Sequence, residues 1–398
     1  MRLAAGSVSP DGDAPDGPAR PPRVLVAGLS TRAIAESAAR AGVAVRSLDG
    51  FGDLDHAARP ALALARDFGL AYDAAAIARI GRDIECDAVV YVASLENHPR
   101  AVARLAGGRA LWGNSPAVLE RVRDPVRLAR ALRARSLPAA AVRTVPPRAA
   151  EAPARWLVKP RASGGGHGIV PWRRGSRLPR RHVLQERIDG VPGSLVFAAD
   201  GRDAVPFGIS WQLAGERELG ASGFQYCGSI LAPAPALLPA ATAIAQALVE
   251  AFGLVGVNGV DFVARDGVPV PIEVNPRCSA SMELAERAFG FSVFRAHVDG
   301  CAGALPRFDL AGALRAAPGA VGKAVLYARR SVLIGDSRRW LERDDVRDVP
   351  HPGERIAAGR PICTIFARGR DAGSCRAALV RRARKLYEEI EGRGRRIA

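Results

Sequence analysis

The chain has 398 residues, of which 48% are apolar, and a formal net charge of +17. This length is sufficient for two or three domains with a sizeable core. No apolar run approaches the roughly 18 residues of a membrane-spanning helix, so a soluble globular protein is expected. The N-terminus has no basic segment followed by an apolar stretch, which predicts that no secretory signal is present.

The arginines and cysteines limit the possible partners and compartment. Only three of the 57 basic residues are lysines, and the arginines are spread along the whole chain. Because no basic motif interleaved with aromatic residues is present, we attribute the high arginine content to general composition. A nucleic-acid-binding surface is kept as the third alternative. The six cysteines form no Cys-x-x-Cys pair, so a reducing cytoplasm is expected rather than a disulfide framework or a zinc site.

Residues 23–113 are predicted to form a parallel α/β domain. Strand patterns at 23–28, 43–45 and 88–93 alternate with helical segments. The loop after the first strand lacks Gly-x-Gly-x-x-Gly, so no dinucleotide site is predicted there. Ser94, Glu96 and Asn97 follow the third strand, at the edge where such sheets place ligands, although ordinary loop polarity explains them equally well.

The next segment combines a helix start with a glycine-rich loop. Asp124 followed by Pro125 is typical of a helix N-terminus, and the helix is predicted to run to about residue 135. A short strand then ends near Lys159, and four glycines follow within five positions: Gly164, Gly165, Gly166 and Gly168. The N–H groups of such a loop can point at phosphate oxygens, although many glycine-rich loops are merely flexible turns.

The strongest signal lies at residues 259–283. An Asp-Gly turn at 266–267 between two apolar strand patterns predicts a β-hairpin. Pairing across this turn brings Asp261 near Glu273, with Asn275 on the same face. Such oxygen ligands suit Mg²⁺ or Mn²⁺, which leaves its other positions to water and phosphate. Solvated acids are the plain alternative, but Glu273 lies inside an apolar run, which favours a metal site.

The lysine-ending strand, the glycine loop and the carboxylate hairpin together resemble those of the ATP-grasp enzymes. The resemblance implies that Asp261, Glu273 and Asn275 hold the magnesium ions of ATP. It also implies that Lys159 contacts the α- or β-phosphate, that glycines 164–168 close over the nucleotide, and that Arg277 faces the transferred phosphate.

The same resemblance implies a role for residues around the predicted strand at 183–188. Glu186 and Ile188 correspond to the adenine edge, and Ser194 to a polar contact, for which a strand-starting serine is an equal alternative. Many members carry an Asp-Lys whose lysine reaches the phosphates. Here a proline follows Asp124, and a solvated helix position is the preferred interpretation of Arg127.

Three later segments carry weaker predictions. Residues 211–231 lack periodicity and are predicted to form a loop near the substrate, with Tyr226 and Gly228 as candidate contacts. Ser279, Ser281 and Glu283 lie near the start of a helix predicted at 282–289, which fits either a substrate anion or a plain N-cap. Strands at 321–328 and within 348–369, followed by a helix at 371–391, resemble the C-terminal β region of the carboxylase-like branch.

The predicted fold class is α/β (α+β), an ATP-grasp fold preceded by a Rossmann-like parallel-sheet domain and followed by a small β-rich region and a terminal helix. The expected divisions are a disordered segment at 1–22, the Rossmann-like domain at 23–113, the ATP-grasp core at 114–300 and the C-terminal region at 301–398.

The closest resemblance is to the predicted ATP-dependent carboligase branch. It implies an ATP- and Mg²⁺-dependent carboxylate–amine ligase that forms an acyl phosphate from small-molecule substrates. One-carbon cofactor biosynthesis, of methylofuran or tetrahydromethanopterin, is the suggested pathway, and a homodimer without nucleic-acid or membrane partners is expected. The alternatives are a carboxylase that activates bicarbonate and a nucleotide-binding protein without turnover.

Overall fold

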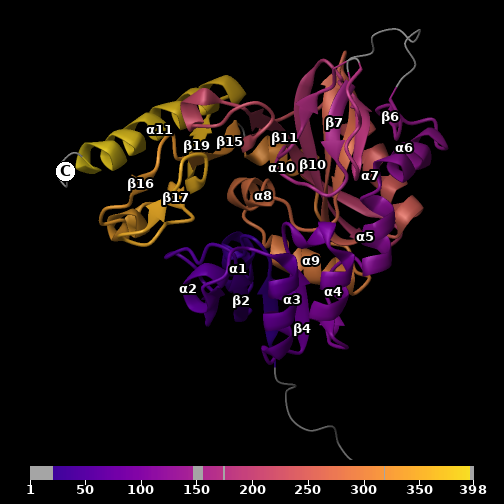
Figure 1. Cartoon of the computed structure of the whole chain (residues 1–398). Helices are drawn as coiled ribbons and strands as arrows, with labels where there is room; N and C mark the ends of the chain where they lie inside the picture. Colours follow the sequence, from indigo (N-terminus) through magenta and orange to yellow (C-terminus); the bar gives the residue numbers. More distant parts are fainter. Residues whose placement is uncertain (1–20, 147–155, 174, 318, 395–398) are drawn as a thin grey trace, which may run out of the picture.

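The computed structural model of the protein describes residues 21–146, 156–173, 175–317 and 319–394. The predicted disordered segment at 1–22 lies almost entirely outside these ranges. Figure 1 shows an N-terminal α/β region, a second region built on long strands, and a C-terminal region that ends in a long helix, with helix α8 (Met282–Phe289) lying among the three.

The N-terminal region is a five-stranded parallel sheet with the strand order β3-β2-β1-β4-β5. Its strands are β1 (Val24–Ala27), β2 (Val45–Asp49), β3 (Ala61–Ala63), β4 (Ala88–Tyr91) and β5 (Ala110–Leu111). Its helices are α1 (Arg32–Arg40), α2 (Leu64–Phe68), α3 (Ala74–Asp83), η1 (Leu95–Asn97) and α4 (Pro99–Ala106). Since every residue of β1 and β4 is buried, these strands read as continuous apolar runs, as expected for a sheet covered on both faces.

The second region contains a small antiparallel sheet and a large one. The four-stranded sheet has the order β6-β9-β7-β8, from β6 (Val142–Arg143), β7 (Trp156–Pro160), β8 (Val170–Pro171) and β9 (His182–Glu186). The eight-stranded sheet begins with β14-β13-β10-β11-β12, namely β10 (Val191–Asp200), β11 (Ala204–Ala214), β12 (Tyr226–Leu231), β13 (Val255–Arg265) and β14 (Val268–Asn275). The helices of this region are α5 (Pro116–Val122), α6 (Pro125–Arg133), α7 (Leu238–Phe252) and the short η2 (Arg217–Leu219).

The C-terminal region continues the same large sheet. Strand β15 (Ala320–Tyr327) pairs with β12, and β19 (Pro361–Gly369) and β17 (Val346–Arg347) follow beyond it. The other elements are α9 (Val293–Cys301), α10 (Leu310–Ala316), β16 (Val332–Leu333), η3 (Arg338–Glu342), β18 (Arg355–Ile356) and α11 (Ala372–Gly394). The predicted division at residue 300 therefore crosses a continuous hydrogen-bonded sheet.

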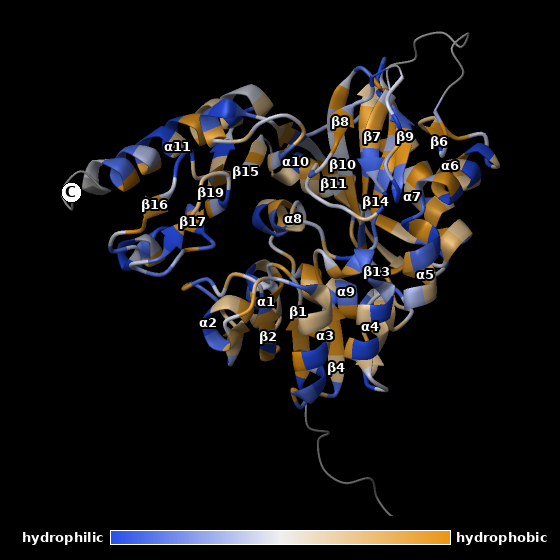
Figure 2. Cartoon of the chain, in the orientation of Figure 1, coloured by the Kyte–Doolittle hydropathy of each residue, from blue (hydrophilic) through white to orange (hydrophobic). Residues whose placement is uncertain are grey.

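One hydrophobic cluster joins the N-terminal region to the large sheet. It contains Val24 and Val26 of β1, Val196 of β10, Val257 of β13 and Phe294 of α9, all at most 3% exposed. Figure 2 shows apolar strands inside each layer, and α11 turns its apolar side toward β15 and β19. The N-terminal region and the large sheet thus share one hydrophobic core and are not packed independently of each other.

Most predicted elements are found, with two exceptions. The predicted strand at 43–45 is displaced, because β2 begins at Val45 and runs to Asp49. The prediction of a loop at 211–231 is wrong, since β11 extends to Ala214 and β12 begins at Tyr226. The strand pattern is obscured there because a bulge between Leu213 and Ala214 interrupts the pairing of β11 with β12, and bulges break the alternation of side chains.

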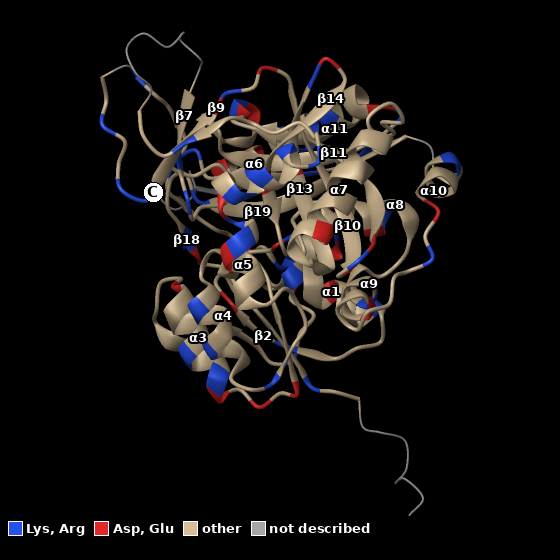
Figure 3. Ribbon diagram, turned by 90° about the vertical axis from the view of Figure 1, so that its right-hand side faces the viewer, with Lys and Arg blue, Asp and Glu red and all other residues tan. Residues whose placement is uncertain are grey.

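Charged residues are widely distributed over the molecule. In Figure 3, Lys and Arg are scattered among Asp and Glu over the helices and loops of all three regions. Within the part of the chain that the structure covers, no helix has the length and apolar character needed to cross a bilayer.

Candidate active site

The predicted hairpin forms, and a β-bulge beside Asp261 sets the register of the two strands at the site. Strands β13 and β14 are joined by a two-residue turn in which Asp266 and Gly267 have φ angles of 52° and 77°, as a type I′ turn requires. Asp261 lies directly opposite Glu273. The Asn275 Nδ2 donates a 3.0 Å hydrogen bond to Asp261 Oδ2, so the three predicted metal ligands lie together.

Two cations converge on Glu273. Lys159, at the end of β7, places its Nζ 2.8 Å from Glu273 Oε2, and Arg123 places its Nη1 2.6 Å from Oε1. Burial alone would raise the pKa of Glu273, but the charges of Lys159 and Arg123 lower it to about 2. Glu273 therefore remains ionised throughout the physiological range.

Asp261 is in the opposite electrostatic situation. Burial and the neighbouring Glu273 raise the pKa of Asp261 above its ordinary value, although Asn275 donates to it. Among the residues described, Asp261 forms no ion pair with a lysine or arginine. A partly buried carboxylate that faces a second carboxylate lacks positive charge, which a bound cation would supply.

Arg277 connects the hairpin to the N-terminal sheet. Its Nη2 lies 2.8 Å from Glu96 Oε1 and 3.2 Å from Asn275 Oδ1. Burial tends to lower the pKa of Arg277, but Glu96, together with the nearby carboxylates of the hairpin, raises it above its ordinary value. Glu96 is only 1% exposed, and its second oxygen, Oε2, has no hydrogen-bond partner in the described chain, so a buried acceptor points into this site.

The glycine loop lies against the same cluster. The carbonyl of Ser163 accepts a 2.9 Å hydrogen bond from Arg123, and the carbonyl of Gly165 accepts one of 3.0 Å from the backbone of Tyr226. Gly166 has a φ of +77°, and a Cβ there would lie 1.8 Å from the carbonyl oxygen of Phe224. Glycine is therefore required at this position for two reasons, its backbone conformation and its close approach.

The residues predicted at the adenine edge lie one strand away from Lys159. In β9, Glu186 pairs with Trp156 while Val183 pairs with Lys159, so Glu186 lies at the far end of this ladder. Glu186 accepts a 3.0 Å hydrogen bond from the backbone N–H of Ala141, and Ile188 packs with Ala140 and Val270. Ser194 lies directly opposite Asp261 on β10 and is buried. Roles of these three residues in nucleotide binding remain predictions.

Arg123 was not predicted as a site residue from the sequence, where Arg127 was considered instead. Arg127 is exposed on α6, which agrees with the solvated helix face that was preferred for it. Asp124 caps this helix by accepting from Val126 and Arg127, as predicted. Arg123, directly before the cap, contacts Glu273, Ser163 and Asn97 Oδ1, the last at 2.7 Å. The only available signal was an arginine at the junction of two helices.

The residues at the start of α8 are occupied by internal contacts. Ser279 and Ser281 place their hydroxyl oxygens 3.0 Å apart. Glu283 forms buried ion pairs with Arg32 of α1 and Lys323 of β15. Glu283 is therefore already paired with two cations, and a substrate anion at the start of α8 would lie beside this neutralised carboxylate.

The oxygen ligands of the hairpin fit a magnesium ion that the nucleotide also binds. Within the described ranges, no group of three or more His, Cys, Asp or Glu side chains could hold a metal ion. Asp261 and Glu273 are two carboxylates with an amide side chain beside them, which matches an ion that keeps water and phosphate oxygens in its shell. The residues fit a nucleotide-bound cation better than a permanently caged one.

The carboxylate hairpin, the lysine-bearing strand and the glycine loop all lie within residues 122–281. This stretch matches the sequence profile of the ATP-grasp domain, which confirms the predicted resemblance. The predicted fold class is also confirmed, because the arrangement of parallel sheet, large antiparallel sheet and helices is that of biotin-carboxylase-like ATP-grasp structures.

Three known proteins illustrate the extent of the similarity. Pyruvate carboxylase of Rhizobium etli superimposes with a TM-score of 0.69 at 17% identity, covering 91% of this chain and 37% of that one. L-amino acid ligase of Bacillus licheniformis superimposes with a TM-score of 0.63 at 15% identity, covering 92% and 98%. At these identities the two structures show a shared fold only.

The third protein is the uncharacterised protein MJ0776 of Methanocaldococcus jannaschii, which is 26% identical over 122 residues. The match spans 30% of this chain and only 28% of that relative.

Proposed function

We propose that the protein is an ATP- and Mg²⁺-dependent carboxylate–amine ligase that acts through an acyl phosphate. The observation that carries this proposal is the contiguous cluster of Lys159, Glu273, Asp261, Asn275 and Arg277 on a matched ATP-grasp domain. No side-chain nucleophile is required, because positioning and charge neutralisation account for most of the catalysis of phosphoryl transfer.

Each residue of the cluster has a role in the proposal. Asp261, Glu273 and Asn275 would hold Mg²⁺, which, when bound, neutralises charge on the phosphate oxygens. Lys159 and Arg123, which pair with Glu273, would contact phosphate oxygens of the nucleotide when a cation occupies the carboxylates. Arg277, held by Glu96, would face the γ-phosphoryl group in flight.

The chemistry balances in two steps. A substrate carboxylate oxygen attacks the γ-phosphorus of ATP, the bond from that phosphorus to the bridging oxygen breaks, and ADP leaves. The amine nitrogen then attacks the acyl carbon, the bond to the phosphate oxygen breaks, and phosphate leaves as the nitrogen loses a proton. The products are an amide, ADP and phosphate.

The substrates are proposed as a small carboxylate and a small amine. An L-amino acid ligase shares the fold, which supports amide formation as the reaction class. Within this class we propose a step of one-carbon cofactor biosynthesis, such as ligation of glutamate to an aromatic amine on the route to methylofuran or tetrahydromethanopterin. A cytoplasmic location is part of the same proposal.

The test is the release of ADP, AMP and phosphate from Mg-ATP with pooled carboxylates and amines, combined with product mass spectrometry. We expect ADP and phosphate, with a product one water lighter than the sum of its two substrates. AMP and pyrophosphate would overturn the acyl-phosphate mechanism. Glutamate with aromatic amines forms a separate pool, and activity only in other pools would refute the pathway assignment alone.

A carboxylase that activates bicarbonate is the second candidate, because pyruvate carboxylase shares the fold over 91% of this chain. The two reactions differ in one measurement. ADP release that depends on bicarbonate and persists without any amine favours the carboxylase. ADP release that requires an amine in bicarbonate-free buffer favours the ligase.

Substitution of Gly166 by alanine is expected to weaken Mg-ATP binding about tenfold or more, because the Cβ would clash with the Phe224 carbonyl at a positive φ. Gly164→Ala is the matched control, since Gly164 has no heavy atom within 4 Å of the added Cβ and no positive φ. Equilibrium binding of a fluorescent ATP analogue to both variants measures the difference. Equal affinities would remove the glycine loop from the nucleotide site.

The affinity for Mg²⁺ is expected to fall at acid pH because of Asp261. The pKa of Asp261 is raised, whereas that of Glu273 is about 2, so only Asp261 gains a proton as the pH falls through mildly acidic values. Protonation removes a ligand charge and weakens binding of the cation. The measurement is the Mg²⁺ dependence of ATP binding between about pH 4 and 8, a range around the ordinary carboxyl pKa. Asp261→Asn is expected to bind Mg²⁺ weakly at every pH, and an unchanged acid limb in this variant would assign the limb to another group.

A further inference from the structure

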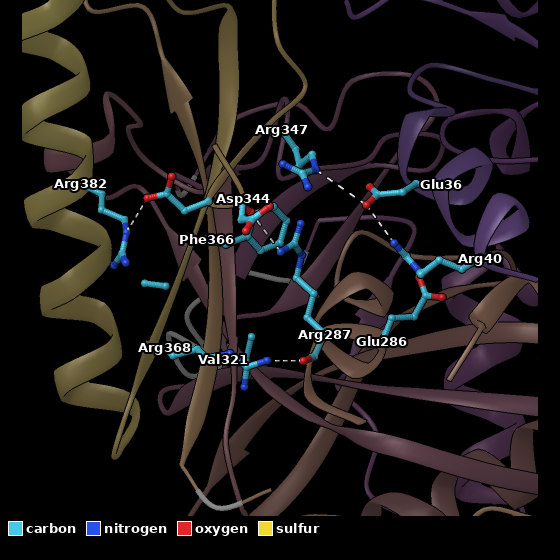
Figure 4. A pocket seen from close by; sticks show the side chains of 12 residues that line it. Glu36, Arg40, Glu286, Arg287, Val321, Asp344, Arg347, Phe366, Arg368 and Arg382 are labelled. Atoms are coloured by element: carbon cyan, nitrogen blue, oxygen red, sulfur yellow. Dashed lines mark hydrogen bonds and ion pairs between the residues drawn. The ribbon is translucent and has the colours of Figure 1, made fainter. Parts of the chain in front are cut away.

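A cavity lies apart from the hairpin cluster, where α1, α8 and the C-terminal strands meet (Figure 4). Its volume is about 580 Å³, within the range of small-molecule sites. The side chains that matter come from α1 (Glu36), α8 (Arg287), β17 (Arg347) and β19 (Phe366 and Arg368). No residue of the proposed nucleotide site lines it.

Three of the four acidic side chains of the cavity are already neutralised. Glu286 forms an ion pair with Arg40 at 2.7 Å, and Glu36 forms an ion pair with Arg32 at 2.7 Å. Asp345 pairs with Arg382 at 2.8 Å. These carboxylates therefore have little capacity left to balance further positive charge.

In the described part of the chain, the other three arginines that line the cavity have no carboxylate at such a short distance. Neither Arg287 nor Arg368 forms an ion pair with any carboxylate among the residues that the structure covers, and both bind only backbone carbonyls. Arg347 has one distant carboxylate, Glu36, at 3.8 Å. The guanidinium of Arg287 lies flat against the ring of Phe366, 3.7 Å from its centroid, which fixes its orientation (Figure 4).

The electrostatics of Arg287 agree with this geometry. Burial lowers the pKa of Arg287, Glu283 acts in the opposite direction, and Arg347 and Arg32 lower it further. Burial is the largest of these causes and arginine stays protonated at all accessible pH values, so Arg287 carries a desolvated positive charge. A bound anion would stabilise that charge.

We propose that this cavity is a binding site for a small polyanion carrying phosphate or carboxylate groups, distinct from the proposed nucleotide site. Arg287, Arg347 and Arg368 would contact the anionic groups, since planar guanidinium groups match both chemistries with paired hydrogen bonds. Phe366 keeps Arg287 extended toward the cavity before the ligand arrives, which reduces the ordering cost of binding.

The site is connected to the rest of the molecule through α8. That helix carries Arg287 in the cavity and Glu283 in the buried pairs with Arg32 and Lys323. A ligand that bridges α8 to β17 and β19 would hold three parts of the fold together, so binding is expected to raise the melting temperature.

The experiment is isothermal titration of the full chain with pyrophosphate and, separately, with citrate, in the absence of metal. The double variant Arg287→Gln/Arg368→Gln is expected to lose about tenfold or more in affinity, because it lacks two charge-assisted contacts. Arg104→Gln is the matched control, since Arg104 is exposed on α4 and outside the cavity. Lys159→Met separates this site from the proposed nucleotide site and should leave the binding intact.

Each outcome decides the proposal. Loss in the double variant with retention in Arg104→Gln and Lys159→Met supports it, and the stronger probe tells phosphate from carboxylate. Loss in Lys159→Met with retention in the double variant, or no binding of either probe at millimolar concentration, overturns it. A wild-type dimer that Arg368→Gln converts to a monomer without any probe binding would identify a second copy as the occupant instead. Because Arg368 is exposed, Arg368→Gln alone also serves if the double variant does not fold.

Discussion

Glu273→Ala is expected to reduce ADP formation by about a thousandfold or more while the protein remains folded. Glu273 is opposite Asp261 and between two cations, Lys159 at 2.8 Å and Arg123 at 2.6 Å. Its removal takes away a proposed metal ligand and leaves these two cations facing each other. The measurement is the initial rate of ADP release at saturating Mg²⁺, alongside the melting temperature.

Two companion variants make this result interpretable. Glu273→Gln preserves the shape of the side chain without its charge and is expected to be nearly as inactive. Glu120→Ala, at an exposed position of α5, removes a carboxylate away from the hairpin and should leave the rate unchanged. A folded Glu273→Ala protein that keeps its activity within tenfold would refute the assignment of the metal site.

The largest effect on stability is expected from Arg32→Met. Arg32 is 1% exposed and lies 2.7 Å from Glu283 and 2.7 Å from Asp348, so it joins α1 to α8 and to the segment after β17. Its loss leaves buried carboxylates without their shared cation, which typically costs about 3–5 kcal/mol. Urea unfolding of both proteins at neutral pH measures the loss.

The pH dependence of this effect has a definite sign. Burial alone would raise the pKa values of Glu283 and Asp348, and the positive charge of Arg32 lowers both below their ordinary values. Groups with lowered pKa values stabilise the fold above their unfolded pKa and lose this contribution as the pH falls through the folded value. The difference between wild type and Arg32→Met should therefore shrink in acid. A difference that is constant down to the acid transition would assign the effect to packing of the Arg32 side chain.

The sequence predicted those parts of the site that local patterns determine. The Asp-Gly turn specifies a two-residue hairpin, which brings Asp261 near Glu273 as predicted. Their direct pairing also requires the β-bulge between Asp261 and Phe262, because the register of the turn alone would place Asp261 opposite Ile272. The capping role of Asp124 also followed from adjacent residues.

The missing parts depend on residues that are distant in sequence. Arg277 and Glu96 are separated by 181 positions, and Arg123 and Glu273 by 150, so no periodicity or spacing indicates that they meet. The first contact arises only when the N-terminal region packs on the hairpin, and the second only when the junction of α5 and α6 packs on it. The prediction for residues 211–231 was wrong for a local reason, because a bulge at Leu213 and Ala214 concealed two strands whose pairing depends on their neighbours.

The course of the large sheet affects how the protein could be shortened or divided. Strand β12 is hydrogen-bonded to β15, which lies beyond the residue at which the C-terminal region was expected to begin. A fragment that ends at residue 300 would keep every residue of the proposed nucleotide site. It would also expose the edge of β12 and the buried apolar side chains beside it, such as Leu219 and Ile230, that pack against the deleted elements, and such an edge pairs readily with other chains. The part of the chain that carries the proposed nucleotide site is therefore not expected to fold as a separate fragment.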